Sequence, residues 1–326
     1  MIPGDLDYRY DRRVDEEFLK LFDSRGVFRT LTEYAQKAQY PVDLQFRLDP
    51  KTRAQHASLY VGLTTVLDIH WKPGSVKLVA NPAFHRAGFN PAWMSWTAVG
   101  EARARADAVD GYLDAVIPRA ASGRAAIEGA VQAAVSSFGS GERIMLDREV
   151  LLHFRNAPTK KRVMDSVCAD LLCAAGEAPV PGVRPTSFGG KCDLLALDSS
   201  GRLLAVEVKP RGVPTIAWAP AQVIVYARLL RLWSRHDPDA AEILSGMVDQ
   251  RKRLGLIATA TPAPRPHLDA LPVVAVQRGM SQEHRHRLFA VLGHLRNQGI
   301  AEAASLKVYE VTLAGRLLEA NDSHEL

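Results

Sequence analysis

Two apolar segments joined by a short turn constrain the fold of this 326-residue chain more than any other feature. Residues 193–197 and 203–209 are mostly apolar, and a Ser-Ser-Gly turn (199–201) lies between them. A three-residue hairpin loop often ends with a residue in the left-handed conformation, which glycine adopts at little cost. We therefore predict a buried antiparallel hairpin in which Asp193 pairs with Glu207.

The predicted register collects charged side chains at one end of this hairpin. Asp193 and Glu207 lie opposite each other, with β-carbons roughly 4.5–5.5 Å apart, and Lys209 points to the same face as Glu207. Directly opposed carboxylates repel, so a cation would stabilise them, and hard oxygen ligands of this kind hold Mg²⁺ or Mn²⁺. The alternative is a structural strand end, in which Lys209 neutralises one carboxylate and Asp193 caps the turn.

This segment resembles the active-site hairpin of the PD-(D/E)xK nuclease superfamily. Asp193 matches the motif aspartate, and Glu207-Val208-Lys209 matches the (D/E)xK element. The stretch 185–190 before the aspartate is similar to that of archaeal Holliday-junction resolvases. The sequence departs from the motif at Cys192, which stands where the motif has proline. The resemblance covers about residues 145–260.

A second motif follows on a predicted helix, residues 217–233. The run from Gln222 to Tyr226 matches the QxxxY motif of the RecB and lambda-exonuclease branch of the same superfamily. Because the two residues are four apart, they share a helix face. The resemblance places them near the metal site, where they hold substrate or the catalytic carboxylates. The alternative is a core tyrosine whose hydroxyl bonds the glutamine.

The resemblance implies an α/β (α+β) fold whose C-terminal part is a restriction-endonuclease-like α/β/α core around a central mixed sheet. It implies a nuclease that hydrolyses phosphodiester bonds, with DNA favoured over RNA and Mg²⁺ or Mn²⁺ as the cofactor. A catalytically silent module of the same fold, which binds nucleic acid or a protein, is the alternative. The catalytic residues implied are Asp193, Glu207, Lys209, Gln222 and Tyr226, and the metal ligands are Asp193, Glu207, the Val208 carbonyl and a third carboxylate.

The third carboxylate is expected on a helix before the hairpin, where family members usually carry an acidic residue. On the predicted helix 159–175, Asp165 lies at the edge of the apolar stripe, within about 20° of Leu172. We therefore expect Asp165 to be the further metal ligand. Its rival is Glu149, on a second predicted helix at 145–156. For both residues the alternative is an ordinary helix acid.

The charge balance permits a polyanionic partner without requiring one. Lys and Arg number 41 against 36 Asp and Glu, a formal charge of +5. The expected nucleic-acid contacts are basic residues close to the motif or at a predicted helix start, although each can also be ordinary solvated charge. They are Lys160, Lys161, Arg162, Lys191 and Arg211.

Two domains are expected from the length of the chain. Residues 1–138 are predicted to form an N-terminal α+β accessory domain of unknown role, with helices in the first forty residues and at 101–137. Residues 139–326 are the nuclease-like domain, and the Ser/Gly-rich stretch 136–141 is the expected linker. The strands predicted in the first domain are 42–48, 59–71 and 76–79, and those of the second, beyond the hairpin, are 254–258, 273–277 and 306–313, with a helix that opens at Ser281.

Other classes of protein are disfavoured by what the sequence lacks. Three cysteines are too few for a disulfide framework and one short of an iron–sulfur ligand set. The N-terminus has no apolar signal-peptide core and no run of 18 apolar residues occurs, so we expect a cytoplasmic protein without a membrane partner. A protein partner or a homo-oligomer is compatible with the sequence.

Overall fold

The computed structural model describes residues 8–37, 42–104, 106–122, 128–137, 143–267, 269–312 and 315–320. By its internal contacts the chain forms two compact units, each with helices and strands, as the predicted α+β class requires. The mixed-sheet unit comprises Met1–Tyr10, Glu142–Glu242 and Pro262–Leu326. The antiparallel-sheet unit comprises Asp11–Gly141 and Ile243–Thr261. The division near residue 141 lies close to the predicted boundary at 138/139, but Ile243–Thr261 belongs with the N-terminal part.

The antiparallel-sheet unit contains a five-stranded sheet in the order β2-β3-β4-β5-β6. The apolar residues of β2 lie in the core together with Phe18 and Phe22, and the polar residues between them are buried as well. Gly74, with φ +75°, lies in the hairpin turn between β4 and β5. The strands are β2 (Val42–Leu48), β3 (Gln55–Val61), β4 (Thr64–Lys72), β5 (Ser75–Ala80) and β6 (Thr97–Ala98).

The helices of this unit include the expected ones in the first forty residues. The predicted helix 101–137 is divided into three, and of the predicted linker only Ser136 and Ser137, the end of α5, are described. The helices are α1 (Glu16–Leu19), α2 (Arg29–Lys37), α3 (Val99–Arg103), α4 (Ala106–Ser122), α5 (Glu128–Ser137) and α8 (Ala240–Arg253), with short 3₁₀ turns η1 (Lys20–Phe22), η2 (Pro82–Ala87) and η3 (Pro91–Met94).

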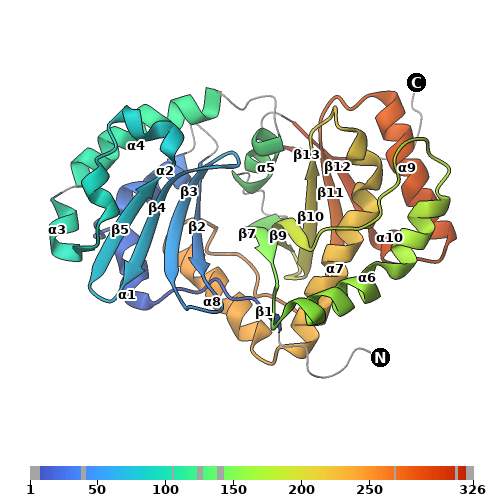
Figure 1. Ribbon diagram of the computed structural model, residues 1–326, viewed down its shortest axis with the longest axis horizontal. Coiled ribbons are helices and arrows are strands. Elements are labelled where there is room, and N and C mark those ends of the chain that lie inside the picture. The colour runs from blue at the N-terminus through green and yellow to red at the C-terminus, as the bar shows by residue number, and fades with distance from the viewer. Residues whose placement is uncertain are drawn as a thin grey trace. The chain divides into compact units, whose positions relative to one another are not determined.

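The mixed-sheet unit contains a six-stranded sheet in the order β13-β12-β11-β10-β9-β7 (Figure 1). The pairs β7/β9, β9/β10 and β12/β13 are antiparallel, whereas β10, β11 and β12 are parallel. A small ribbon pairs β1 with β8. The strands are β1 (Tyr8–Arg9), β7 (Arg143–Leu151), β8 (His153–Phe154), β9 (Lys191–Asp198), β10 (Leu203–Lys209), β11 (Leu271–Gln277), β12 (Lys307–Val311) and β13 (Leu317–Glu319).

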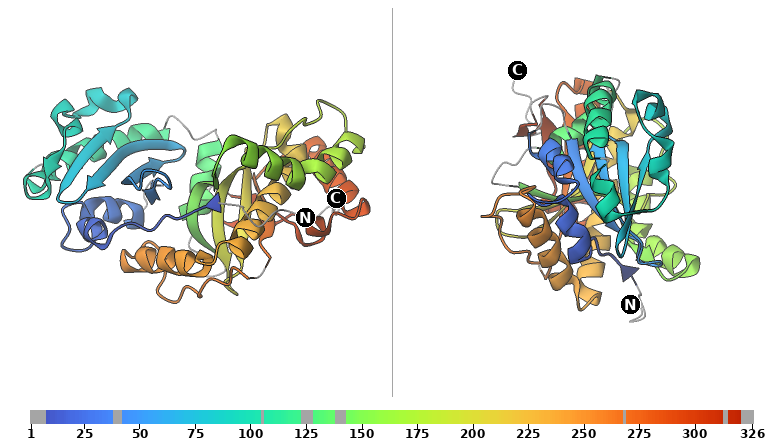
Figure 2. Two further views of the ribbon diagram at one scale, coloured as in Figure 1. Left: turned by 60° about the horizontal axis from the view of Figure 1, so that its bottom comes forward. Right: turned by 90° about the vertical axis from the view of Figure 1, so that its left-hand side faces the viewer.

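A layer of helices lies beside the mixed sheet (Figure 2). Helix α7 contacts β10 and β11, and both α6 and α9 contact α7. Ser281 is the N-cap of α9, as predicted, and accepts the His284 N–H. The α/β/α layering of a nuclease core stays a prediction. The helices are α6 (Ala157–Glu177), η4 (Pro214–Trp218), α7 (Ala219–His236), α9 (Gln282–Asn297) and α10 (Ala301–Ser305).

The predicted strand 59–71 is divided into β3 and β4, which pair with each other. Two other predicted elements are wrong. Residues 145–156 form strands β7 and β8 rather than a helix, because an irregularity between Met145 and Asp147 interrupts the period of two that reveals a strand. Residues 254–258 are not a strand but follow the end of α8. Gly255, with φ +63°, closes that helix with a bond from its N–H to the Lys252 carbonyl.

A search of the helices in the described ranges finds none with the length and apolar character needed to cross a membrane.

Candidate active site

The hairpin formed by β9 and β10 has the predicted register. Leu203 pairs with Leu197, and the ladder keeps this register toward the open end of the hairpin. Gly201 has φ +83°, the left-handed conformation expected at the end of the turn. The next pair along the strands beyond the assigned ladder is Asp193 and Glu207, as the sequence predicts.

Asp193, Glu207 and Lys209 form a compact cluster at this end of the hairpin. The Asp193 Oδ2 accepts the Val208 N–H at 2.8 Å. The Lys209 Nζ lies 2.5 Å from Glu207 Oε1, and the two side chains are 12% and 1% exposed. Glu207 Oε2 is buried, and no described residue gives it a hydrogen bond. If the cluster is only a strand end neutralised by Lys209, the ion pair satisfies Glu207 Oε1 but not Glu207 Oε2.

The electrostatics of the cluster disfavour its negative charge. Burial, followed by repulsion from Asp193, raises the pKa of Glu207 well above its ordinary value, against the opposing effect of Lys209. Burial also raises the pKa of Asp193, although the Val208 N–H and Lys209 act in the opposite direction. Burial thus outweighs the nearby ammonium groups in both pKa shifts, and a bound cation would favour the charged forms of the two carboxyls.

A hard divalent cation fits this donor set. Carboxylate oxygens are its preferred ligands, and the unsatisfied Glu207 Oε2 supplies a free lone pair. Within the described ranges, no group of three or more His, Cys, Asp or Glu side chains is placed to hold a metal. An ion here would therefore take two carboxylates, with backbone carbonyls, water or phosphate oxygens completing its shell. The predicted ligand role of the Val208 carbonyl stays a prediction.

The QxxxY pair lies close to these carboxylates. Gln222 Nε2 donates to the Tyr226 hydroxyl at 2.6 Å, and Tyr226 is only 2% exposed. Burial and then the charge of Glu207 raise the pKa of Tyr226, so the hydroxyl remains protonated within electrostatic reach of the pair. The structural alternative predicts a tyrosine that is hydrogen-bonded to the glutamine, and this bond is present. The resemblance implies that the tyrosine lies near the carboxylates, and Glu207 does influence its pKa.

Asp165 is not brought to the cluster by its helix. The residue lies on α6, its side chain is 62% exposed, and Lys161 Nζ pairs with it at 2.6 Å. Helical periodicity placed it at the edge of the apolar stripe, but its side chain lies on the exposed side of α6. Its expected role as a metal ligand is without support in the described contacts.

Glu149, the rival, lies on β7 beside β9. Strand pairing aligns Arg148 with Leu194 and Val150 with Cys192, so Glu149 stands opposite Asp193. Its side chain pairs with Lys191 at 3.0 Å. It also has φ +54°, a conformation that costs a non-glycine residue on the order of 1–3 kcal/mol. Sequence reasoning assigned this stretch to a helix and so missed the juxtaposition.

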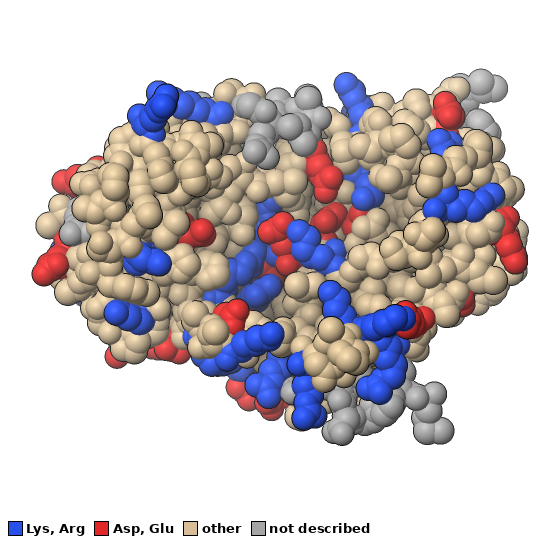
Figure 3. All heavy atoms as spheres, in the orientation of Figure 1, with Lys and Arg blue, Asp and Glu red and all other residues tan. Residues whose placement is uncertain are grey.

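The predicted nucleic-acid contacts differ in their surroundings. Lys160 and Arg162 are exposed near the start of α6, and Arg211 is exposed after β10, whereas Lys161 and Lys191 pair with acids. On the face shown in Figure 3, Lys and Arg side chains lie among Asp and Glu side chains. The sites of contact with a polyanion stay predictions.

A cavity of about 470 Å³ adjoins the QxxxY pair in the mixed-sheet unit. Its lining includes Gln222, the loop 182–189 before β9, and Arg287 from α9. Sequence reasoning missed this cavity because Arg287 comes from a helix that follows the motif by some sixty residues. The only signal was the glycine- and proline-rich composition of the loop.

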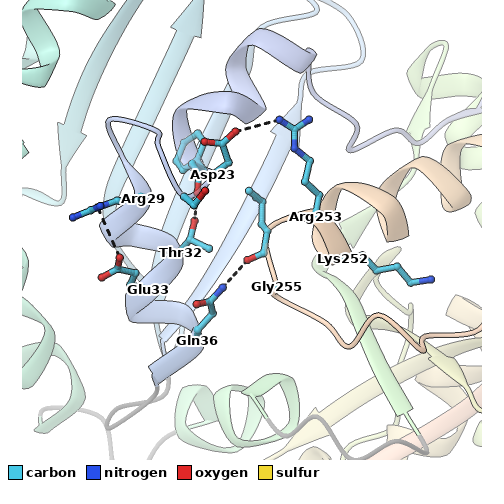
Figure 4. Close-up of a pocket in the computed structure, with 11 residues that line it drawn as sticks. Asp23, Arg29, Thr32, Glu33, Gln36, Lys252, Arg253 and Gly255 are labelled. Atoms are coloured by element: carbon cyan, nitrogen blue, oxygen red, sulfur yellow. Dashed lines mark hydrogen bonds and ion pairs between the residues drawn. The ribbon is translucent and has the colours of Figure 1, made fainter.

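A second hollow lies in the antiparallel-sheet unit, between α2 and the end of α8 (Figure 4). Its polar side chains bind one another. Arg253 pairs with Asp23 at 3.3 Å, Arg29 with Glu33 at 3.8 Å, and Gln36 donates to the Leu254 carbonyl at 2.7 Å. Because Gln36 joins α2 to the residue after α8, and Arg253 joins α8 to Asp23, these two contacts explain locally why Ile243–Thr261 belongs to this unit.

No family model, curated protein or solved structure matches this chain. The functional assignment therefore depends on the geometry and chemistry of the site.

Proposed function

We propose that this protein is a metal-dependent nuclease of the PD-(D/E)xK type, with DNA as its favoured substrate. The observation that carries the proposal is the buried Asp193–Glu207 pair with Lys209 at the end of the β9–β10 hairpin. Perturbed carboxylates with one unsatisfied oxygen are costly for a fold to keep without a function. The motif residues Gln222 and Tyr226 beside the pair add support.

The roles of the residues follow from their positions. Asp193 and Glu207 would hold Mg²⁺ or Mn²⁺, which when bound supplies a Lewis acid for the phosphate and lowers the pKa of a bound water. Lys209 places its ammonium beside Glu207, where it can orient the attacking water and stabilise negative charge on the phosphate. Gln222 and Tyr226 hold their hydrogen bond at the edge of the pair and fix the position of substrate or carboxylate.

The rival function is a silent module of the same kind, in which the cluster is only a strand end. The 2.5 Å contact between Lys209 and Glu207 favours this alternative, since it is an ion pair that closes one side of the cluster. It does not explain the unsatisfied Glu207 Oε2. The nuclease accounts for all three groups.

A cleavage assay tests the proposal. Purified protein is incubated with labelled single-stranded and duplex DNA and RNA in Mg²⁺, Mn²⁺ or EDTA. We expect cleavage that requires metal and falls by about 10²-fold or more in Glu207→Gln and Lys209→Ala. Glu319→Gln, on β13, is the matched control because this exposed carboxylate pairs with Lys307 at the surface.

Three results would count against the proposal. Cleavage that persists in Glu207→Gln would show that the reaction does not require Glu207. Cleavage in EDTA would show that the reaction does not require a metal ion. No cleavage of any of the four polymers by folded wild-type protein would favour the silent module.

A further inference from the structure

The cavity next to Gln222 has the size and the charge of a site for a small anionic ligand. Its volume of about 470 Å³ lies within the range of ligand pockets, roughly 300–1,000 Å³. Arg184 and Arg287 are the charged residues of its lining, which contains no acidic residue. The remaining polar groups are hydroxyls of Ser187 and Thr215 and the amide of Gln222.

Arg287 is the most informative of these residues. Its side chain is 13% exposed, its Nη2 donates to the Pro181 carbonyl at 2.7 Å, and its Nη1 lies 3.8 Å from the exposed Glu283. Its Nε is buried, and none of the residues described here accepts a hydrogen bond from it. A guanidinium that lines a cavity beside a second arginine, with no acidic residue in the lining, is suited to a phosphate, which accepts several charge-assisted hydrogen bonds.

Two aromatic rings line the same cavity. Phe188 and Trp218 are 9% and 7% exposed, so only a small part of each ring is available. The Trp218 Nε1 donates to the Val183 carbonyl at 3.2 Å, which fixes the orientation of the indole. Fixed aromatic surfaces are the usual contacts of unstacked nucleobases.

We propose that this cavity binds one unpaired nucleotide of a nucleic-acid strand, with a phosphate at Arg287 and the base against Phe188 and Trp218. The inference rests on the proposed nuclease function and deepens it by naming the substrate. A nucleotide must leave its base pair to enter such a pocket. The strand is therefore single-stranded where it meets Gln222, whose amide links the cavity to Tyr226 and the carboxylates.

A binding measurement in EDTA tests the inference without cleavage. The probe is tetrathymidylate with a 5′ phosphate and a 3′ fluorescein, followed by anisotropy, and the competitor is a blunt duplex. We expect Arg287→Gln to weaken tetranucleotide binding about tenfold or more, because a charge-assisted hydrogen bond is lost. Thr215→Trp, which adds bulk at the exposed lining without removing a contact, should have a similar effect.

Arg235→Gln is the matched control, since this arginine lies on α7 outside the cavity and pairs with the exposed Asp269. Its affinity should stay within about twofold of wild type. Melting temperatures establish that each variant is folded. Equal binding by wild type and both cavity variants, no binding by wild type, or duplex binding as tight as that of the single strand would overturn the inference.

The two proposals fail in different ways. If metal-dependent cleavage is lost in Glu207→Gln while the cavity variants bind normally, the nuclease proposal is supported and the nucleotide pocket is refuted. If neither the wild type nor any variant cleaves a polymer, but binding of the tetranucleotide depends on Arg287, the pocket is supported and the catalytic assignment is refuted.

Discussion

Binding of Mn²⁺ should raise the melting temperature of the mixed-sheet unit, and Glu207→Gln should abolish that increase. The reason is that burial disfavours the charged forms of Asp193 and Glu207, which a cation bound only to the folded state would stabilise. In the unfolded chain these residues lie fourteen positions apart and do not form a site. Metal binding should therefore increase the free energy of unfolding.

The size of the increase follows from mass action and from the size of the unit. At a metal concentration of about 100 times the dissociation constant, binding adds about 2.7 kcal/mol to the free energy of unfolding. The mixed-sheet unit has about 180 residues, for which 1 kcal/mol corresponds to about 2–4 °C. The expected increase is therefore about 5–10 °C.

Glu207→Gln also distinguishes a metal site from a structural ion pair when EDTA has removed the metal. Burial and Asp193 disfavour the charged form of Glu207, so the neutral isostere should melt at or above the wild-type temperature. If the contact between Glu207 and Lys209 is instead a stabilising buried pair, its loss costs about 3–5 kcal/mol. That cost would lower the melting temperature by about 6–20 °C.

Thermal unfolding followed by circular dichroism, with Mn²⁺ or EDTA, measures both quantities. Glu319→Gln is again the control and should behave as wild type in each condition. A metal site at Asp193 and Glu207 would be contradicted by two results together. Glu207→Gln would melt well below wild type in EDTA, and Mn²⁺ would leave the wild-type melting temperature unchanged.

Three further predictions concern other parts of the chain. Burial, followed by the charge of His70, lowers the pKa of His56 from 6.5 to about 4. The unfolded chain then binds a proton that the folded chain rejects, so the free energy of unfolding should fall by up to about 3 kcal/mol between pH 6.5 and pH 4. Urea titrations at each pH measure this, and His56→Gln should flatten the profile. Arg228→Leu leaves Asp170 and Glu302 without their shared partner and should lower the free energy of unfolding in urea by about 3 kcal/mol. In cleavage assays Glu149→Gln should lower the rate about tenfold, because it stands opposite Asp193, while Asp165→Asn should stay within about twofold.

Features set by neighbouring residues could be predicted from the sequence. The β9–β10 hairpin is the main example, because its register depends only on the turn glycine and on the two apolar strands beside it. Strand β2 and the N-cap at Ser281 are equally local. The opposition of Asp193 and Glu207 could thus be derived before any coordinates were known.

Features that depend on distant contacts could not be predicted. By helical periodicity Arg228 falls on the polar face of α7, but its side chain is only 13% exposed, and Asp170 on α6 and Glu302 on α10 both bind it. Helical periodicity cannot show that a polar face is covered by two other helices. The short apolar run 254–258, which follows α8, was predicted as a strand, because an apolar pattern over so few residues does not establish one.

The residues of the candidate site also differ in whether local sequence or distant contacts bring them together. Asp193, Glu207 and Lys209 are contributed by one hairpin, so a motif of fewer than twenty residues contains them. Glu149 reaches Asp193 only through the pairing of β7 with β9, and Arg287 reaches the cavity only from α9. Under the proposed function, the hairpin residues would carry the chemistry, and the distant residues would decide which substrate enters. A variant of Glu207 therefore tests whether the chain cleaves, and a variant of Arg287 tests what it cleaves.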